Sequence, residues 1–149
     1  MADILHFIKV KAEPARVCEA LTTPEGIRSW WTRDADLEQR VGGVGGFRFF
    51  SPERETRVII ETLEPPSRVG WKVTGSFLPN WIGTRIGFDA RADDVGAALS
   101  FAHRGFAQAD EAYAAVNTGW AYYLVSLQQY LETGAGAPSP DLDFRRMVR

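Results

Sequence analysis

The stretch Asp110–Thr133, DEAYAAVNTGWAYYLVSLQQYLET, decides the fold, because it is the one long helical pattern in the sequence. Its apolar side chains recur at steps of three and four residues, which places them on one face of a helix roughly 36 Å long. Gly134 suits the position that ends a helix, and Pro138 prevents its continuation. The predicted apolar face consists of Tyr113, Val116, Trp120, Tyr123, Leu124, Leu127 and Leu131.

Short apolar runs separated by turn residues fill most of the chain before this helix. They predict strands over residues 3–11, 47–50, 56–63, 68–74, 81–91 and 97–104. The turns between consecutive strands are too short for a crossover, so neighbouring strands must be antiparallel. Two short helices are predicted after the first strand, over residues 12–21 and from Pro24 to about Trp31. The glycine-rich segment 42–46 reads as a hinge or bulge where the sheet curls.

The helix and the sheet each have one apolar face, and the two faces must bury each other. An antiparallel sheet of this size twists and curls. We therefore predict an α+β helix-grip fold, in which a curved antiparallel sheet of about six or seven strands wraps around the long C-terminal helix. Residues 1–138 are predicted to form one domain, and residues 139–149 an irregular tail.

Composition narrows the class of protein. The chain has 149 residues, 45% of them hydrophobic, and a net charge of -2 from 19 acidic and 17 basic side chains. This balance gives no basic surface for nucleic acid. No apolar stretch is long enough to cross a bilayer, so no membrane role is expected. The single cysteine, Cys18, excludes an internal disulfide and fits a reducing compartment, so we predict a cytoplasmic protein.

Aromatic residues point to the function. Five tryptophans occur in the chain, and strand alternation turns several aromatic side chains toward the long helix. They either fill a solid core or line an apolar cavity for a small ligand, and the sequence leaves both readings open. If a cavity exists, its predicted ligand-binding residues are Trp30, Phe49, Trp71, Phe88, Phe101, His103, Trp120 and Tyr123.

His103 is the main polar candidate. It alternates with Leu99 and Phe101 and therefore points inward. An inward imidazole either transfers a proton as a catalytic group or is a core residue hydrogen-bonded to a hydroxyl such as that of Tyr113 or Tyr123. Two scattered histidines and one cysteine do not form a usual zinc site, and the sequence contains no nucleotide-binding loop. We therefore expect neither a metal nor a cofactor.

The order of several motifs resembles the START-like, Bet v 1-type superfamily (SRPBCC domains), and within it the branch named after the activator of Hsp90 ATPase homologue. The motifs are residues 12–17, 21–32 and 46–49, Glu64-Pro65-Pro66 followed by Trp71, residues 103–106, and Gly119-Trp120 followed by Tyr123-Leu124 and Leu127. The resemblance implies a helix-grip fold with a cavity that holds lipids, polyketides or other hydrophobic molecules. It implies no particular reaction, because relatives include carriers, cyclases and co-chaperone domains.

Three functions follow from these observations. The leading one is a non-enzymatic module that binds a hydrophobic small molecule, such as a lipid, polyketide or aromatic metabolite, between the sheet and the long helix. The second is a cyclase or dehydratase that uses His103 as acid or base. The third is a co-chaperone or other protein-interaction module. A homodimer formed through an edge strand is also open.

Overall fold

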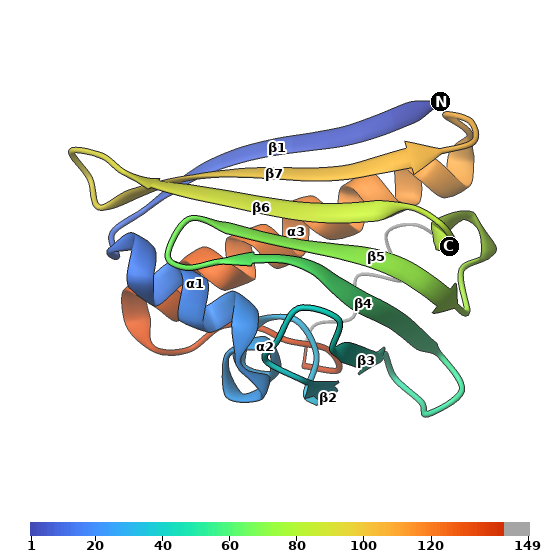
Figure 1. Cartoon of the computed structure of the whole chain (residues 1–149), viewed down its shortest axis with the longest axis horizontal. Helices are drawn as coiled ribbons and strands as arrows, with labels where there is room; N and C mark the ends of the chain where they lie inside the picture. Colours follow the sequence, from blue (N-terminus) through green and yellow to red (C-terminus); the bar gives the residue numbers. More distant parts are fainter. Residues whose placement is uncertain (142–149) are drawn as a thin grey trace.

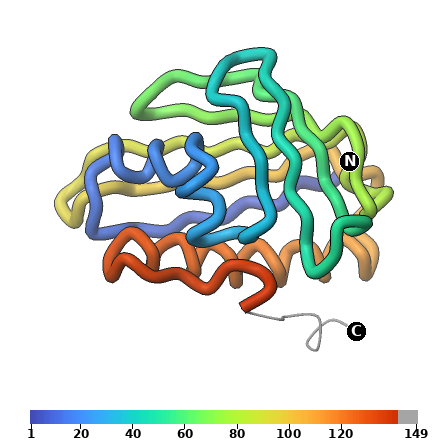
Figure 2. Tube along the Cα trace, turned by 90° about the horizontal axis from the view of Figure 1, so that it is seen from below, coloured from blue at the N-terminus to red at the C-terminus, as the bar shows by residue number. Residues whose placement is uncertain are grey.

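The computed structural model describes residues 1–141, which form a seven-stranded antiparallel sheet packed against a long helix. The strand order is β1-β7-β6-β5-β4-β3-β2. Figure 1 shows this curved sheet with α3 behind it, and Figure 2 shows α3 running along one side of the sheet. The strands are β1 (Ala2–Val10), β2 (Asp34–Leu37), β3 (Val44–Arg48), β4 (Glu55–Glu64), β5 (Arg68–Ser76), β6 (Arg85–Ala92) and β7 (Ala97–Phe106). The α+β helix-grip prediction is therefore confirmed.

The helices are α1 (Pro14–Thr22), α2 (Pro24–Trp30) and α3 (Glu111–Thr133), with a short 3-10 helix η1 (Pro79–Trp81) between β5 and β6. Thr23 caps α2, since its hydroxyl accepts a hydrogen bond from the Gly26 N–H at 3.0 Å. Asp110 caps α3 in the same way through the N–H of Tyr113. The helix α3 is terminated by Gly134, which follows its last residue Thr133 and whose φ of +88° a residue with a side chain rarely adopts.

The inner face of the sheet follows the predicted alternation. On β7, Leu99, Phe101 and His103 are buried and face α3, while Ser100 and Arg104, which point the other way, are exposed. The neighbouring strands repeat this pattern, so every central strand contributes inward side chains to one core. These inward residues include Val58 and Ile60 on β4, Val69, Trp71 and Val73 on β5, and Ile86 and Phe88 on β6.

Two local predictions are wrong. A strand was predicted from Trp81 to Arg91, but Trp81 ends η1 and β6 begins only at Arg85. Pro79 favours the helical turn because its fixed φ suits the first position of a helix. The second error concerns the glycine-rich segment, which was expected to precede a strand. In the structure β3 begins at Val44 and includes Gly45, where a Cβ atom would lie 2.9 Å from a methyl carbon of Leu37.

The chain after α3 folds back under α2. Ser126 on α3 donates a hydrogen bond to the carbonyl of Trp30 at 2.8 Å and accepts one from the N–H of Ala137 at 2.7 Å. The N–H of Ser139 then donates to the carbonyl of Trp31. The described part of the predicted irregular tail, residues 139–141, is thus joined to the domain, and the rest of that tail lies outside the described residues.

The charged residues of the sheet lie mainly on its outer face. Arg48 is held by three carboxylates, Asp34, Asp36 and Glu55, at N–O distances of 2.7 to 2.8 Å. These hydrogen bonds, led by the one to Asp34, raise the pKa of the Arg48 guanidinium above its ordinary value. Arg48 on β3 therefore ties the acidic residues of the edge strand β2 to Glu55 on β4.

Candidate functional site

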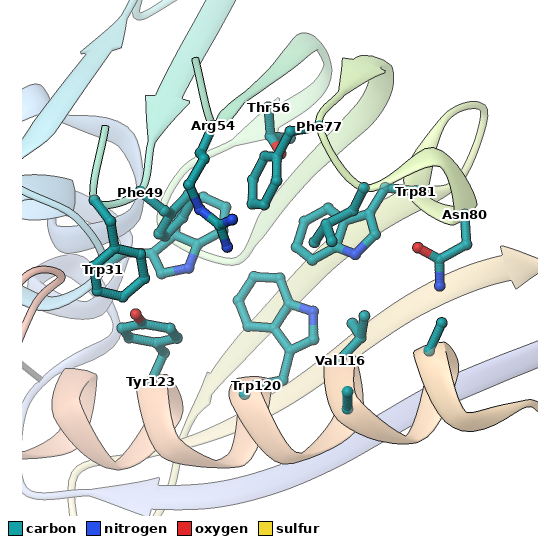
Figure 3. Close-up of a pocket in the computed structure, with 15 residues that line it drawn as sticks. Trp31, Phe49, Arg54, Thr56, Phe77, Asn80, Trp81, Val116, Trp120 and Tyr123 are labelled. Atoms are coloured by element: carbon teal, nitrogen blue, oxygen red, sulfur yellow. The ribbon is translucent and has the colours of Figure 1, made fainter. Parts of the chain in front are cut away.

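A cavity of about 190 Å³ lies between one end of the sheet and the first half of α3. Figure 3 shows side chains from the segment between β3 and β4, from η1 and from α3 converging on it. It is partly open to solvent. The cavity is lined by Trp31, Phe49, Phe50, Arg54, Thr56, Phe77, Leu78, Asn80, Trp81, Ala112, Ala115, Val116, Gly119, Trp120 and Tyr123. Apart from Arg54, Thr56 and Asn80, these residues are apolar, aromatic or glycine.

Stacked tryptophans form one wall of the cavity. The ring of Trp120 on α3 lies between Trp31, at 5.1 Å between ring centroids, and Trp81, at 5.9 Å. Both pairs are nearly parallel, with interplanar angles of 26° and 22°. Trp31 also stacks on Trp71, so the wall continues into the core beneath the sheet. Large stacked rings of this kind have few alternative rotamers, and the wall is therefore preformed.

Arg54 is the one charged residue among the described residues that line the cavity. Its guanidinium lies over the ring of Phe77 at 4.6 Å and over that of Phe50 at 5.9 Å. These are cation–π geometries, which hold the side chain across the aromatic rings. No aspartate or glutamate of residues 1–141 lines the cavity.

His103 lies beneath the tryptophan wall and is fully buried. Its Nδ1 accepts a hydrogen bond from the indole Nε1 of Trp120 at 3.0 Å, so its Nε2 carries the proton. That Nε2 donates to the hydroxyl of Thr84 at 2.7 Å, and the hydroxyl in turn donates to the carbonyl of Trp81. This relay connects α3, β7 and η1, and it fixes two of the tryptophans that form the wall.

Desolvation by burial lowers the pKa of His103 from 6.5 to about 3. The ring is therefore neutral near neutral pH, as its hydrogen bonds require. Because both ring nitrogens are engaged and the ring does not line the cavity, this geometry favours a structural role over proton transfer. The hydroxyl partner is that of Thr84, not of Tyr113 or Tyr123.

The eight residues predicted to bind a ligand fall into two groups. Phe49, Trp120 and Tyr123 line the cavity. The others, Trp30, Trp71, Phe88, Phe101 and His103, lie in the packed core and do not line it. Their rings are in direct contact, with centroids 5.4 Å apart for Trp71 and Phe88, 5.3 Å for Phe88 and Phe101, and 4.4 Å for Phe101 and Trp120.

Sequence reasoning missed several lining residues. Trp31 was not predicted as a lining residue, whereas its neighbour Trp30 was. The indole of Trp30 instead donates to the carbonyl of Ala20 and so joins α2 to α1. Trp81 was assigned to a strand, and Arg54 and Asn80 were not considered. The signal that could have found Trp81 is the proline two residues before it, which predicts a turn rather than a continued strand.

Within residues 1–141 no three His, Cys, Asp or Glu side chains are grouped so that they could hold a metal ion. None of the helices there is long and apolar enough to cross a membrane.

Comparison with known proteins agrees with this architecture. The family model "Activator of Hsp90 ATPase homolog 1-like protein" matches residues 11–132, which is most of the chain. The chain belongs to this family. The match extends from just before α1 to the last turn of α3, and so covers strands β2 to β7 and the helix between which the cavity lies. No curated protein matches the sequence.

Solved structures extend the comparison of this Hsp90-activator-homologue-like chain. An Aha1 dimer from Colwellia psychrerythraea is 33% identical with a TM-score of 0.82, covering 91% of this chain and all of that one. Protein SSP2350 from Staphylococcus saprophyticus is 22% identical with a TM-score of 0.76, covering 91% and 95%. A protein of this family from Aeromonas hydrophila is 14% identical with a TM-score of 0.72, covering 89% and 94%. The last two show the fold alone.

Proposed function

We propose that this protein binds a small hydrophobic molecule in the cavity between η1 and the first half of α3. The observation that carries the proposal is the preformed cavity of about 190 Å³ with an almost wholly apolar, aromatic lining. An apolar cavity of roughly 150 Å³ can hold benzene, whereas sites for drug-sized ligands measure about 300–1,000 Å³. The enclosed part of the ligand is therefore about the size of one substituted ring or a short branched chain.

Of the residues predicted from sequence, Phe49, Trp120 and Tyr123 contact the ligand in this proposal, and Trp31, Phe77 and Trp81 join them. The proposal gives the packed core residues Trp30, Trp71, Phe88, Phe101 and His103 a supporting role, because they hold the tryptophan wall in place. A cyclase or dehydratase that uses His103 has no support in this arrangement, since that ring reaches no ligand in the cavity.

The experiment is a titration with toluene followed by proton–nitrogen correlation NMR. Each tryptophan gives one indole N–H signal, so the five tryptophans report separately. The signals of Trp81 and Trp120 should shift and saturate, whereas that of Trp30, whose indole is hydrogen-bonded to Ala20 away from the cavity, should stay in place. A linear, unsaturable drift of all five signals would argue against a binding site.

We propose in addition that two copies associate through the outer face of β1. Leu5 and Phe7 are 61% and 53% exposed there, and the 33% identical Colwellia relative is described as a dimer. The edge of β1 is less suited to pairing, because α3 already covers part of it. Tyr113 donates to the carbonyl of Asp3 at 2.6 Å, and Gln128 to that of Lys9 at 2.7 Å.

Sedimentation velocity over a range of protein concentrations tests this association. Leu5→Glu should convert a dimer into a monomer, since it would bury a carboxylate in an apolar contact. Ile59→Glu, at a 39% exposed apolar residue of β4, is the matched control and should leave the dimer intact. A wild-type protein that sediments as a monomer at all concentrations would contradict the proposal.

A further inference from the structure

Two hydrogen-bond donors at one end of the cavity have no acceptor. The indole Nε1 of Trp81 is buried without a hydrogen-bond partner in the structure, and so is the side-chain Nδ2 of Asn80. Trp81 as a whole is only 7% exposed. In Figure 3 its indole nitrogen points into the space beside Asn80, Val116 and Trp120. A buried donor without a partner costs free energy, and such groups in folded proteins are usually satisfied by a ligand or by water.

The contrast with the neighbouring tryptophans makes the observation specific. Trp120 donates its indole N–H to His103, and Trp30 donates to Ala20, so both are satisfied inside the protein. Trp81 has the same kind of group in the same aromatic cluster, yet its N–H faces the cavity. Among the described polar residues that line the cavity, Asn80 is the one next to Trp81 in the chain, and its amide could serve a ligand.

The charge of the lining points in the same direction. Arg54 brings a positive charge to another part of the wall, and no carboxylate of the described residues lines the cavity. A ligand with an ammonium group would find no carboxylate to pair with among the described residues that line the cavity. A ligand oxygen that accepts hydrogen bonds would meet the two donors, and a carboxylate would in addition be attracted by the guanidinium.

We propose that the ligand carries a carbonyl-type oxygen, from a ketone or a carboxylate, which accepts hydrogen bonds from Nε1 of Trp81 and Nδ2 of Asn80 while its apolar body lies against Trp120. This inference rests on the proposed function, because it names the chemistry of the ligand for the same cavity. Amines of the same size are disfavoured, because no carboxylate of the described residues lines the cavity to pair with an ammonium group.

The test compares four probes of similar size: ethylbenzene, acetophenone, phenylacetate and 1-phenylethylamine. Acetophenone and phenylacetate should shift the Trp81 indole signal strongly downfield in the proton–nitrogen spectrum, as a new hydrogen bond does, and ethylbenzene should shift it little. The amine should not bind. In Trp81→Phe the Kd of acetophenone should rise about fivefold more than that of ethylbenzene, which is the scale of one hydrogen bond. For each probe, the Kd of the variant is divided by that of the wild type, and these ratios are compared. This comparison cancels differences in hydration between the probes.

Two further variants distinguish a ketone oxygen from a carboxylate oxygen. Arg54→Met should weaken phenylacetate about tenfold and leave acetophenone almost unchanged, because only the carboxylate is charged. Arg68→Met is the control, since Arg68 lies outside the cavity in an exposed ion pair with Glu64. Asn80→Asp, which replaces a donor by an anion, should weaken phenylacetate more than acetophenone and leave ethylbenzene unaffected.

The outcomes distinguish this inference from the function beneath it. If none of the four probes saturates a site, the proposed function itself fails. If ethylbenzene binds while the Trp81 signal stays in place with acetophenone and Trp81→Phe changes both affinities equally, only the carbonyl inference is overturned. Should Trp81→Phe not fold, the wild-type indole shift and the Asn80→Asp variant decide the question by themselves.

Discussion

The indole Nε1 of Trp120 on α3 donates a hydrogen bond to Nδ1 of His103 on β7 over 3.0 Å. Both residues are buried, so the bond forms in a medium of low dielectric constant, where it is strong and where its loss is expensive. It joins the long helix to the sheet directly behind the cavity. The position of the cavity wall therefore depends on a neutral histidine that makes no contact with the cavity.

Replacing this histidine should destabilise the protein strongly. His103→Leu leaves the Trp120 N–H without an acceptor and removes the donor to Thr84, so we expect a loss of about 2–4 kcal/mol in the free energy of unfolding. Urea denaturation measures it. His6→Leu is the control, because Nε2 of His6 has no hydrogen-bond partner in the structure, and it should cost less than about 1 kcal/mol. Equal losses in the two variants would contradict the relay.

The same histidine predicts a pH dependence of stability. Burial lowers its pKa from 6.5 to about 3, so between these values the unfolded chain binds a proton that the folded chain does not. The contribution of His103 is thus complete above about pH 6.5 and declines by about 1.4 kcal/mol per pH unit as the pH falls toward 3. The difference in unfolding free energy between wild type and His103→Leu should therefore shrink as the pH falls. Taking this difference cancels the effect of the other titrating groups, which both proteins share. A difference that stays constant from pH 7 to pH 4 would show that the folded histidine titrates normally.

Much of the fold could be predicted from the sequence, because it depends on periodic patterns. The three- and four-residue spacing over residues 110–133, with Gly134 after it, places α3 to within a residue of its observed bounds. The alternation of Leu99, Phe101 and His103 gives their inward direction on β7. Such patterns are local, and each is repeated several times along the element, so a single irregular residue does not hide them.

The cavity could be predicted only in part, because it depends on distances between elements. The alternation of side chains along a strand predicts that Trp71 and Phe88 point inward. It does not predict that their ring centroids lie 5.4 Å apart and leave no space between them. Adjacent Trp30 and Trp31 are equally aromatic, and only the path of the chain after α2 decides that Trp31 faces the cavity. A cavity depends on how all the elements pack together, so no periodic pattern in the sequence predicts it.

A second buried polar group should matter for the chain reversal after α3. Ser126→Ala removes both the hydrogen bond to the Trp30 carbonyl and the one from the Ala137 N–H, so a loss of about 1–3 kcal/mol is expected by urea or thermal denaturation. Ser29→Ala removes only an exposed hydroxyl contact to Glu25 and should cost less than about 0.5 kcal/mol. If Ser126→Ala costs no more than Ser29→Ala, this serine does not hold the two segments together.

The measurement that tests the central claim most directly is toluene binding by two variants of the same helix. Ala115 lines the cavity, whereas Ala114 beside it is exposed and does not. Ala115→Leu fills the space with three extra carbon atoms and should abolish saturable binding, while Ala114→Leu should bind like the wild type. Equal binding by both variants would mean that the ligand lies elsewhere and that this cavity is not the site.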